Sequence, residues 1–292
     1  MSVVFAVRNE QEYVQSAVLS VLDQQGLELE VVVVDDGSTD GTFGLLEQLA
    51  AGQNRVRLVR NPGTGKCSAF NYGVSLATGR FTCIFAGDDL MPQGSLAARF
   101  EAVRALPEDK PVVGLCKIIS MAEDPKFDKV IVPRKRGRGA LSGVSPLMNQ
   151  RSLHLMFPVP VDLPNEDTWM ELAVQHLSGW IVVHSDIIGC RWRVHQGNSI
   201  NMLLSFPEYN RRISARMRAL PLFRERFSEA LSAEGRRNLD GKIACEEARI
   251  RGSVLGVLLS KADFVSRLRS LSVTNGYFYA LRQRLFRLFS GW

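Results

Sequence analysis

The feature that most constrains the fold is a run of four valines, residues 31–34, that leads directly into Asp35 and Asp36. Four consecutive β-branched residues predict a strand covered on both faces, as in a parallel sheet. The two carboxylates then stand at the carboxyl end of that strand, which is the edge where open α/β sheets bind ligands. After them, Gly37 permits a turn and the polar residues 38–40 can cap the next helix. A carboxylate placed there can accept hydrogen bonds from a nucleobase or from ribose hydroxyls.

The first 119 residues alternate between strand and helix patterns. Strands are expected at 2–7, 30–34, 55–60, 80–86 and 111–119, and helices at 11–23, 42–51, 68–77 and 95–106. This alternation predicts a right-handed, mostly parallel α/β sheet flanked by helices. Beyond residue 120 the pattern loosens: a helix is expected at 168–177, strands at 180–183 and 187–194, and mostly helices from residue 205 to the end.

Composition limits the class of protein. Hydrophobic residues make up 46% of the 292 residues, which is enough for a substantial core. No apolar run reaches the roughly 18 residues of a membrane-spanning helix. The five scattered cysteines form no Cys-x-x-Cys pair, and the first expected strand begins at Ser2, so we expect a cytoplasmic protein without a disulfide framework or a signal peptide. The net charge of +6 indicates an anionic partner such as a nucleotide, a phospholipid or nucleic acid.

A second acidic pair, Asp88 and Asp89, follows the strand expected at 80–86. Because the carboxyl ends of parallel strands meet at one edge of a sheet, this pair can share a site with Asp35 and Asp36. A divalent cation is often held by one or two carboxylates together with substrate phosphates. The second pair therefore predicts a metal site for a diphosphate, and capping of the following helix is the alternative interpretation.

Five blocks of sequence occur in a fixed order: Val3–Glu10, Ser20–Gln24, Val33–Thr42, Gly65–Gly73 and Phe85–Asp89. With them, residues 2 to about 200 resemble a family 2 glycosyltransferase of the GT-A fold. The resemblance implies a Rossmann-like, mostly parallel sheet flanked by helices over residues 1–204, with a nucleotide-sugar half at about 1–110 and an acceptor half at about 111–204. It does not extend to residues 205–292, where we expect a basic helical region that contacts a membrane surface or a second subunit.

The resemblance also implies roles for residues on the nucleotide side. Ala6, Arg8 and Glu10 belong to the loop under the nucleotide. Asp35 and Asp36 end the second strand. Of the two, Asp36 would accept a hydrogen bond from a base N–H, a role suited to uracil. The resemblance also implies that Lys66 lies near the ribose or the phosphates.

For the diphosphate, the resemblance implies that Asp88 and Asp89 form the Asp-x-Asp-type element. Asp89 is then the more direct ligand of a manganese or magnesium ion. Arg193 would neutralise phosphate charge. His195 would be a third metal ligand or a contact to the diphosphate, and an ordinary structural histidine is the alternative.

Inverting transfer requires a base that deprotonates the acceptor hydroxyl as it attacks the anomeric carbon. Residues 165–169 resemble the Glu-Asp element of the family, which implies Asp167 as the base and Glu166 as the second choice. The alternative for Asp167 is capping of the helix that it opens.

The segment 277–289 alternates aromatic or aliphatic residues with arginines. On a helix its apolar residues gather near one face, which predicts a helix lying in a membrane interface. The alternative is a helix that packs its apolar face on the catalytic domain. The basic loop at 134–138 either meets lipid phosphates or is solvated.

Together these features predict a metal-dependent, inverting glycosyltransferase. It would move a sugar from a nucleotide-sugar, preferably UDP-linked, to a glycan or lipid-linked acceptor in bacterial surface polysaccharide assembly, in the cytoplasm or on the inner membrane face. Two other classes stay open: a nucleotidyltransferase, and a non-enzymatic transferase-like or nucleic-acid-binding module. Residues 7–10 lack the glycine-rich phosphate loop of the first class. Both acidic pairs and the Glu-Asp element are intact, which disfavours a non-enzymatic module. We therefore expect no nucleic acid as a partner.

Overall fold

The computed structural model describes residues 1–195 and 204–285. These residues form two compact units. Unit 1 comprises Met1–Met170 and Gly179–Val194, and unit 2 comprises Glu171–Ser178 together with residues 195 and 204–285. The division into a nucleotide half, an acceptor half and a helical region that begins at residue 205 stays a prediction.

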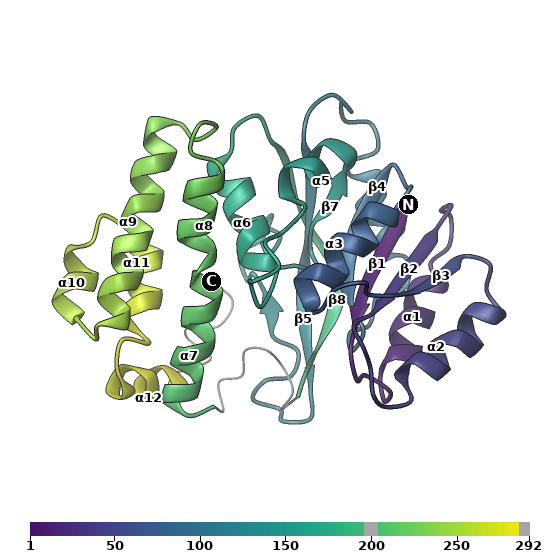
Figure 1. Cartoon of the computed structure of the whole chain (residues 1–292), viewed down its shortest axis with the longest axis horizontal. Coiled ribbons are helices and arrows are strands. Elements are labelled where there is room, and N and C mark those ends of the chain that lie inside the picture. Colours follow the sequence, from purple (N-terminus) through teal and green to yellow (C-terminus); the bar gives the residue numbers. More distant parts are fainter. Residues whose placement is uncertain (196–203, 286–292) are drawn as a thin grey trace. The chain divides into compact units, whose positions relative to one another are not determined.

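The amino-terminal part of unit 1 follows the predicted alternation of strands and helices (Figure 1). Its strands are β1 (Ser2–Val7), β2 (Glu30–Asp35), β3 (Val56–Arg60) and β4 (Phe81–Ala86), and its helices are α1 (Val14–Leu22), α2 (Thr42–Ala51) and α3 (Lys66–Leu76). The four strands are all parallel and lie in the order β3-β2-β1-β4. The carboxyl ends of β1, β2 and β4, where the acidic residues stand, therefore share one edge of the sheet.

The second part of unit 1 makes the sheet mixed. It contains α4 (Ser95–Glu101), β5 (Val112–Ala122), β6 (Ile131–Val132), β7 (Leu147–Asn149), α5 (Gln150–Met156) and β8 (Ile181–Val194). The sequence analysis missed β6, β7 and α5. The three-residue strand β7 lies antiparallel between β4 and β5 and is too short to show a periodicity. The sheet stays mostly parallel, as predicted.

The two strands expected at 180–183 and 187–194 are in fact the single strand β8, which pairs in parallel with β5. Polar residues interrupt the apolar pattern in its middle, but each has a partner. The hydroxyl of Ser185 donates to the carbonyl of Leu115 (3.1 Å), and Asp186 lies 3.2 Å from the ammonium of Lys117. The register between β5 and β8 shifts at this point. The strand therefore continues to Val194 and carries Arg193 to the edge where β4 ends.

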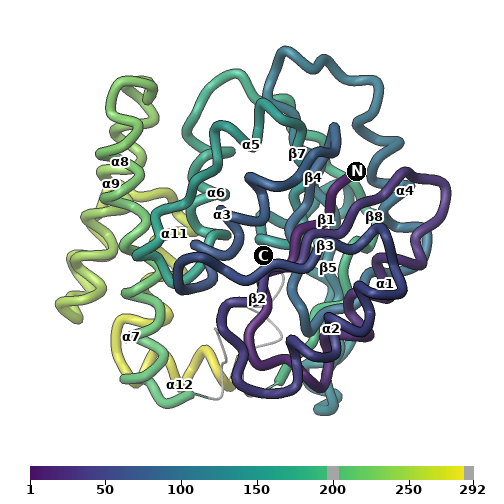
Figure 2. Tube along the Cα trace, turned by 45° about the vertical axis from the view of Figure 1, so that its right-hand side comes forward, coloured from purple at the N-terminus to yellow at the C-terminus, as the bar shows by residue number. Residues whose placement is uncertain are grey.

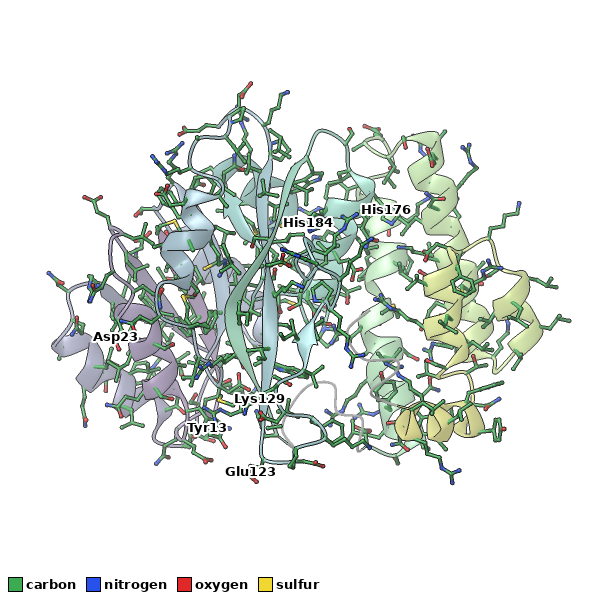
Figure 3. The ribbon with its side chains drawn as sticks, turned by 180° about the vertical axis from the view of Figure 1, so that it is seen from behind. Tyr13, Asp23, Glu123, Lys129, His176 and His184 are labelled. Atoms are coloured by element: carbon green, nitrogen blue, oxygen red, sulfur yellow. The ribbon has the colours of Figure 1, made fainter. Side chains whose placement is uncertain are left out.

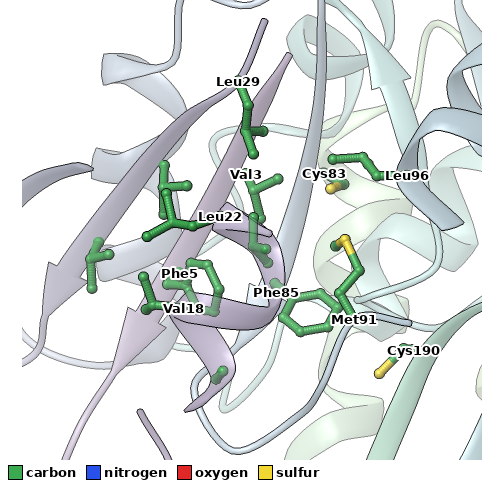
Figure 4. Packing of buried hydrophobic residues seen from close by; sticks show 14 of the residues in the cluster. Val3, Phe5, Val18, Leu22, Leu29, Cys83, Phe85, Met91, Leu96 and Cys190 are labelled. Carbon is green, nitrogen blue, oxygen red and sulfur yellow. The ribbon is translucent and has the colours of Figure 1, made fainter. Parts of the chain in front are cut away.

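The core of unit 1 explains why the valine run forms a strand. Val31 and Val33 pack on the face covered by α1 and α2, in a cluster that includes Phe5 and Phe85 (Figure 4). Helix α3 covers the other face of β1 and β2, as the trace in Figure 2 also shows. Gly73 permits this close approach, because a Cβ there would lie 2.4 Å from a methyl carbon of Val4.

Unit 2 is helical, as predicted. Helix α6 (Asp167–His176) runs from unit 1 into unit 2, and the helices that follow are α7 (Phe206–Met217), α8 (Ala219–Arg226), α9 (Ala233–Ile250), α10 (Val254–Leu259), α11 (Phe264–Leu271) and α12 (Gly276–Arg284). In the parts of the chain that the structure describes, no helix has both the length and the apolar character needed to cross a bilayer.

The expected interfacial helix at 277–289 is described only as far as residue 285. Its described part is α12, in which Tyr279 is buried against Tyr209 with 4.9 Å between the ring centroids. Tyr277, in contrast, is 75% exposed. Residues 286–289 lie outside the described residues, so membrane contact through this helix stays a prediction.

Candidate active site

Hydrogen bonds tie the loop after β1 to the loop after β2. Asn9, whose φ is 54°, accepts the N–H of Thr39 (2.8 Å), and its own N–H donates to the hydroxyl of Ser38 (3.0 Å). The N–H of Glu10 donates to the hydroxyl of Thr42 (2.8 Å). Of the polar residues expected to cap α2, two therefore fix the first loop instead. The result is a cross-linked pair of loops at the carboxyl ends of β1 and β2.

Asp35 and Asp36 have different surroundings. Asp35 is fully buried, accepts the N–H of Ser38 and lies 3.5 Å from a guanidinium nitrogen of Arg60. Asp36 accepts the N–H of Gly65 (2.8 Å) and a side-chain N–H of Asn61 (2.7 Å). Asp36 thereby holds the loop that begins α3. Its side chain is 7% exposed, so it is the member of the pair that retains some contact with solvent.

The second acidic pair is locked to the end of β8. Asp89 is 1% exposed, and its carboxylate accepts the backbone N–H of Arg193 (2.8 Å) and faces the thiol of Cys190 (3.4 Å). The guanidinium Nε of Arg193 in turn donates to the backbone carbonyl of Asp88 (2.8 Å). Leu90 then forms a two-way bridge with the backbone of residue 191. The structure therefore brings Asp88, Asp89 and Arg193 together, although about 100 residues of chain separate them.

The guanidinium of Arg193 lies over the ring of Tyr13, 4.4 Å from its centroid. Figure 3 shows Tyr13 at the same end of unit 1 as Glu123 and Lys129, which follow β5. The ends of β1, β4, β5 and β8 thus meet in one region. Nothing in the sequence singles out Tyr13, because it lies in an ordinary helical pattern that gives no functional signal.

Glu10 is the most perturbed carboxylate at this edge. Its side chain packs against Gly87, where a Cβ would lie 1.8 Å from Oε2. Among the described residues this buried Oε2 atom has no hydrogen-bond partner. Burial, with Asp88 as the next cause, raises the pKa of Glu10 to about 8. Burial and Asp88 likewise raise the pKa of Asp89 to about 7. The edge thus concentrates carboxylates that favour the approach of a cation.

The predicted base element lies beside the predicted phosphate-binding lysine. The ammonium of Lys66 is 3.4 Å from Oε1 of Glu166, whose side chain is 4% exposed. Gly143 leaves room for this carboxylate, since a Cβ there would lie 2.5 Å from Oε1. Asp167, the first residue of α6, is half-buried and accepts the N–H of Thr168 (2.8 Å). Because Glu166 is already engaged by Lys66, this contact favours Asp167 over Glu166 as the base.

The remaining predicted residues lie as follows. Ala6 is buried in β1 between Val34 and Ala86. The side chain of Arg8 is 62% exposed and lies 4.0 Å from Asp36. His195 is the last described residue before residue 204 and belongs to unit 2. Within residues 1–195 and 204–285, no three His, Cys, Asp or Glu side chains are grouped in a way that holds a metal ion. The role of His195 stays a prediction.

The donor set at this edge nevertheless suits a divalent cation that arrives with a diphosphate. Such ions take oxygen ligands and are often held by one or two carboxylates, while substrate phosphates and water complete the shell. Asp88 and Asp89 supply carboxylates, and the unpartnered oxygen of Glu10 lies nearby as a further oxygen donor. Two basic side chains, Lys66 and Arg193, lie near the same carboxylates, and their contact with phosphate oxygens stays a prediction. The site therefore has the parts needed to bind a nucleoside diphosphate that carries a leaving group.

The mixed, mostly parallel sheet with its flanking and carboxyl-terminal helices is the GT-A fold of glycosyltransferases. TarS residues 1–349 from S. aureus, solved with UDP-GlcNAc, superimposes with a TM-score of 0.55 at 16% identity, over 98% of this chain and 91% of that one. The mannosyltransferase PcManGT from Pyrobaculum calidifontis, solved with GDP-Man and Mn2+, superimposes with a TM-score of 0.54 at 16% identity, over 98% and 87%. These likenesses establish the fold.

Sequence comparison points to a family. Residues 2–140, just under half of the chain, match glycosyl transferase family 2. The putative teichuronic acid biosynthesis glycosyltransferase TuaG of Bacillus subtilis is 32% identical over 102 residues, which are 35% of this chain and 40% of TuaG. The curated relatives are matched over 9–40% of their own length. The predicted resemblance to family 2 glycosyltransferases and the predicted fold are therefore confirmed.

Proposed function

We propose that the protein is a metal-dependent, inverting glycosyltransferase that transfers a sugar from a UDP-sugar to a glycan or lipid-linked acceptor. The observation that carries the proposal is the union of Asp88, Asp89 and Arg193 at the end of β4 and β8. Lys66 supplies a second basic side chain and is paired with Glu166. The next residue in the chain, Asp167, is the first residue of α6. Diphosphate ligands and a candidate base thus belong to one unit of the structure.

On the nucleotide side, we infer that Asp36 reads the base. Its carboxylate uses two of about four acceptor positions on Asn61 and Gly65, so it retains capacity for a base N–H. Uracil offers an N–H at a suitable edge, and the TarS structure with UDP-GlcNAc supports a UDP-linked donor by fold likeness. Lys66 and Arg193 bind phosphate oxygens and keep the diphosphate in place as the sugar departs.

Asp88 and Asp89 would hold a manganese or magnesium ion. When bound, the ion stabilises the negative charge that develops on the departing diphosphate. The structure of PcManGT with GDP-Man and Mn2+ supports this assignment by fold likeness. Because Asp89 is already fixed by the N–H of Arg193, the position of its carboxylate depends on the end of β8.

Asp167 takes the proton from the acceptor hydroxyl, on the side of the sugar opposite the diphosphate. Glu166 holds Lys66 and does not act as the base. Bacterial surface polysaccharide assembly is the setting that we propose, and the description of TuaG as a teichuronic acid biosynthesis enzyme supports it. The acceptor in that setting is a growing glycan or a lipid-linked sugar at the membrane.

A donor screen tests the proposal. Purified protein is incubated with UDP- and GDP-sugars, with and without manganese, and slow hydrolysis of the donor is measured. We expect hydrolysis of a UDP-sugar that requires the metal. Asp89→Ala should abolish it and weaken metal-dependent donor binding. Asp167→Asn should retain donor binding and lose about 100-fold or more in transfer once an acceptor is known, as is usual for a general base.

Each open alternative gives a different outcome. In a parallel incubation with a nucleoside triphosphate and a sugar phosphate, a nucleotidyltransferase would form a sugar nucleotide. A non-enzymatic module would leave all donors intact in the presence of manganese. Full turnover in Asp89→Ala would remove the metal assignment, and full turnover in Asp167→Asn would show that another base operates.

A further inference from the structure

Of the nine large exposed hydrophobic side chains in the described part of unit 2, six lie on two short helices, α10 and α11. They are Leu255, Leu258 and Leu259 on α10, and Phe264, Val265 and Leu268 on α11. Leu259 ends α10 and Phe264 begins α11 after a four-residue connection, and they are 73% and 70% exposed. We refer to these six residues as the α10–α11 patch. Such a concentration of exposed apolar side chains marks an interaction surface rather than ordinary surface scatter.

Helix α11 directs its apolar face outward. On a helical projection Phe264, Val265 and Leu268 share one face, and Ser266 and Ser270 share the opposite one. The three apolar residues are exposed, whereas both serines are partly buried. In an ordinary surface helix the two faces would be reversed. Leu271, at the end of the same face, packs against the small core of unit 2, whereas Phe264, Val265 and Leu268 stay exposed and are available to a partner.

The patch is preformed and does not result from loose packing. Beneath it, Val257, Cys245, Ala248 and Ala262 form a small buried core. Asp263 caps α11 by accepting the N–H of Ser266 (2.9 Å). The guanidinium of Arg267 donates to the carbonyl of Leu258 (3.0 Å) and so ties α11 to α10. The apolar side chains are thus held outward by a defined set of contacts.

The segment that carries the patch is basic. Residues 251–271 contain four basic residues, Arg251, Lys261, Arg267 and Arg269, and one acidic residue, Asp263. Arg251 is paired with Glu247 of α9 at 3.9 Å. That aspartate is engaged in the helix cap and lies 3.9 Å from the ammonium of Lys242. On α11, Arg267 and Arg269 flank the apolar face on its two sides. Apolar side chains bordered by cations are typical of a helix that lies in the interface of an anionic membrane. The buried core of a protein–protein interface is instead depleted of charge.

We propose that the α10–α11 patch docks on an anionic lipid surface, with its leucines and Phe264 inserted among the acyl chains and its basic residues near the lipid phosphates. This surface differs from the segment 277–289 considered above. The inference deepens the proposed function, because it names the surface from which a lipid-linked acceptor is taken. Vesicle binding is measured without donor or acceptor, however, so its outcome does not depend on glycosyl transfer.

Co-sedimentation with vesicles tests the proposal. The whole protein is mixed with vesicles of phosphatidylcholine alone or of phosphatidylcholine and phosphatidylglycerol. We expect at least ten-fold stronger binding to the anionic vesicles, and weaker binding at higher salt. Leu259→Gln combined with Phe264→Gln should reduce that binding at least ten-fold. The matched control is Val161→Gln in unit 1, which removes another apolar side chain that is 59% exposed and should leave binding unchanged.

A second variant tests the contribution of the basic residues to vesicle binding. Lys261→Gln with Arg269→Gln should weaken binding to anionic vesicles by about five-fold for each basic residue removed. Thermal unfolding checks that each variant is folded. Equal binding by the wild type and the Leu259/Phe264 variant, or no binding to anionic vesicles, overturns the proposal. A dimer in light scattering that the same variant dissociates, without vesicle binding, would assign the patch to a second copy of the chain instead.

Discussion

Asp89→Asn should stabilise the metal-free protein at high pH while it removes activity. The wild-type carboxyl is buried to 1% exposure, and burial together with Asp88 raises its pKa from 3.8 to about 7. The asparagine side chain has nearly the same shape and keeps an oxygen that accepts the N–H of Arg193. The substitution therefore removes a buried negative charge and retains most of the local packing.

The sign of the pH dependence follows from proton binding. Between pH 4 and 7 the folded protein holds a proton at Asp89 that the unfolded chain has released, so stability falls as pH rises through this range. One pKa unit corresponds to about 1.4 kcal/mol, so the full shift is worth about 4 kcal/mol at pH 8. The hydrogen bond from Arg193 is weaker to a neutral oxygen than to a charged one. We therefore expect a gain of about 2–4 kcal/mol at pH 8 and less than about 1 kcal/mol at pH 4.5.

Urea unfolding at pH 4.5 and pH 8, in the presence of EDTA, measures both values. Asp23→Asn is the control: Asp23 is exposed at the end of α1, away from Tyr13 in Figure 3, and its replacement should change stability by less than about 0.5 kcal/mol. If Asp89→Asn has the same effect at both pH values, the effect comes from packing and not from charge. If it has no effect at pH 8, the buried carboxylate carries no electrostatic cost and the reasoning is refuted.

Two further predictions concern packing and a buried ion pair. Gly73→Ala places a methyl group 2.4 Å from Val4 and should lower the free energy of unfolding of the protein by about 1–3 kcal/mol, measured by the same urea titration; an unchanged midpoint would show that α3 shifts without cost. Arg249 is 1% exposed, and its Nε and Nη2 atoms bind Glu246 at 2.7 and 2.6 Å. Arg249→Ala leaves that carboxylate unpaired and should cost about 3–5 kcal/mol, whereas Arg251→Ala, at a side chain 66% exposed, should cost less than about 1 kcal/mol.

The perturbed carboxylates also bear on how the proposed site binds its donor. Glu10 and Asp89 lie close to the same neighbour, Asp88, and each is easier to protonate than an isolated carboxyl. A cation that binds between Asp88 and Asp89 displaces protons, so its affinity should rise with pH. Titration of manganese at pH 6 and pH 8, followed by calorimetry with a UDP-sugar, measures this dependence directly.

The local chemistry of the chain was sufficient to predict the parallel half of the sheet. A run such as Val31–Val34 is stable only when both of its faces are covered, and the helical periodicities between the strands supply the cover. The same pattern places Asp36, Asp88 and Asp89 at strand ends, because a parallel sheet aligns the carboxyl ends of its strands. The mostly helical character of residues 205–285 was equally readable, since helices depend on contacts within a few residues.

The sequence did not reveal β7 or the continuity of β8. A three-residue strand has no measurable period, and the polar residues in the middle of β8 resemble a loop until Leu115 and Lys117 appear as their partners. Those partners lie about 70 residues away in the chain. No local rule indicates them, because only the assembled sheet satisfies the polar groups.

What the sequence determined by itself was therefore the set of elements and the kinds of side chain at their ends. What only the tertiary structure decided was which of those side chains meet: Arg193 with Asp89, Lys66 with Glu166, and the outward direction of Phe264 on α11. The physical reason is that the first set depends on interactions over a few residues, which the order of amino acids fixes directly. The second depends on register, strand order and burial, and these are set by the packing of the whole unit.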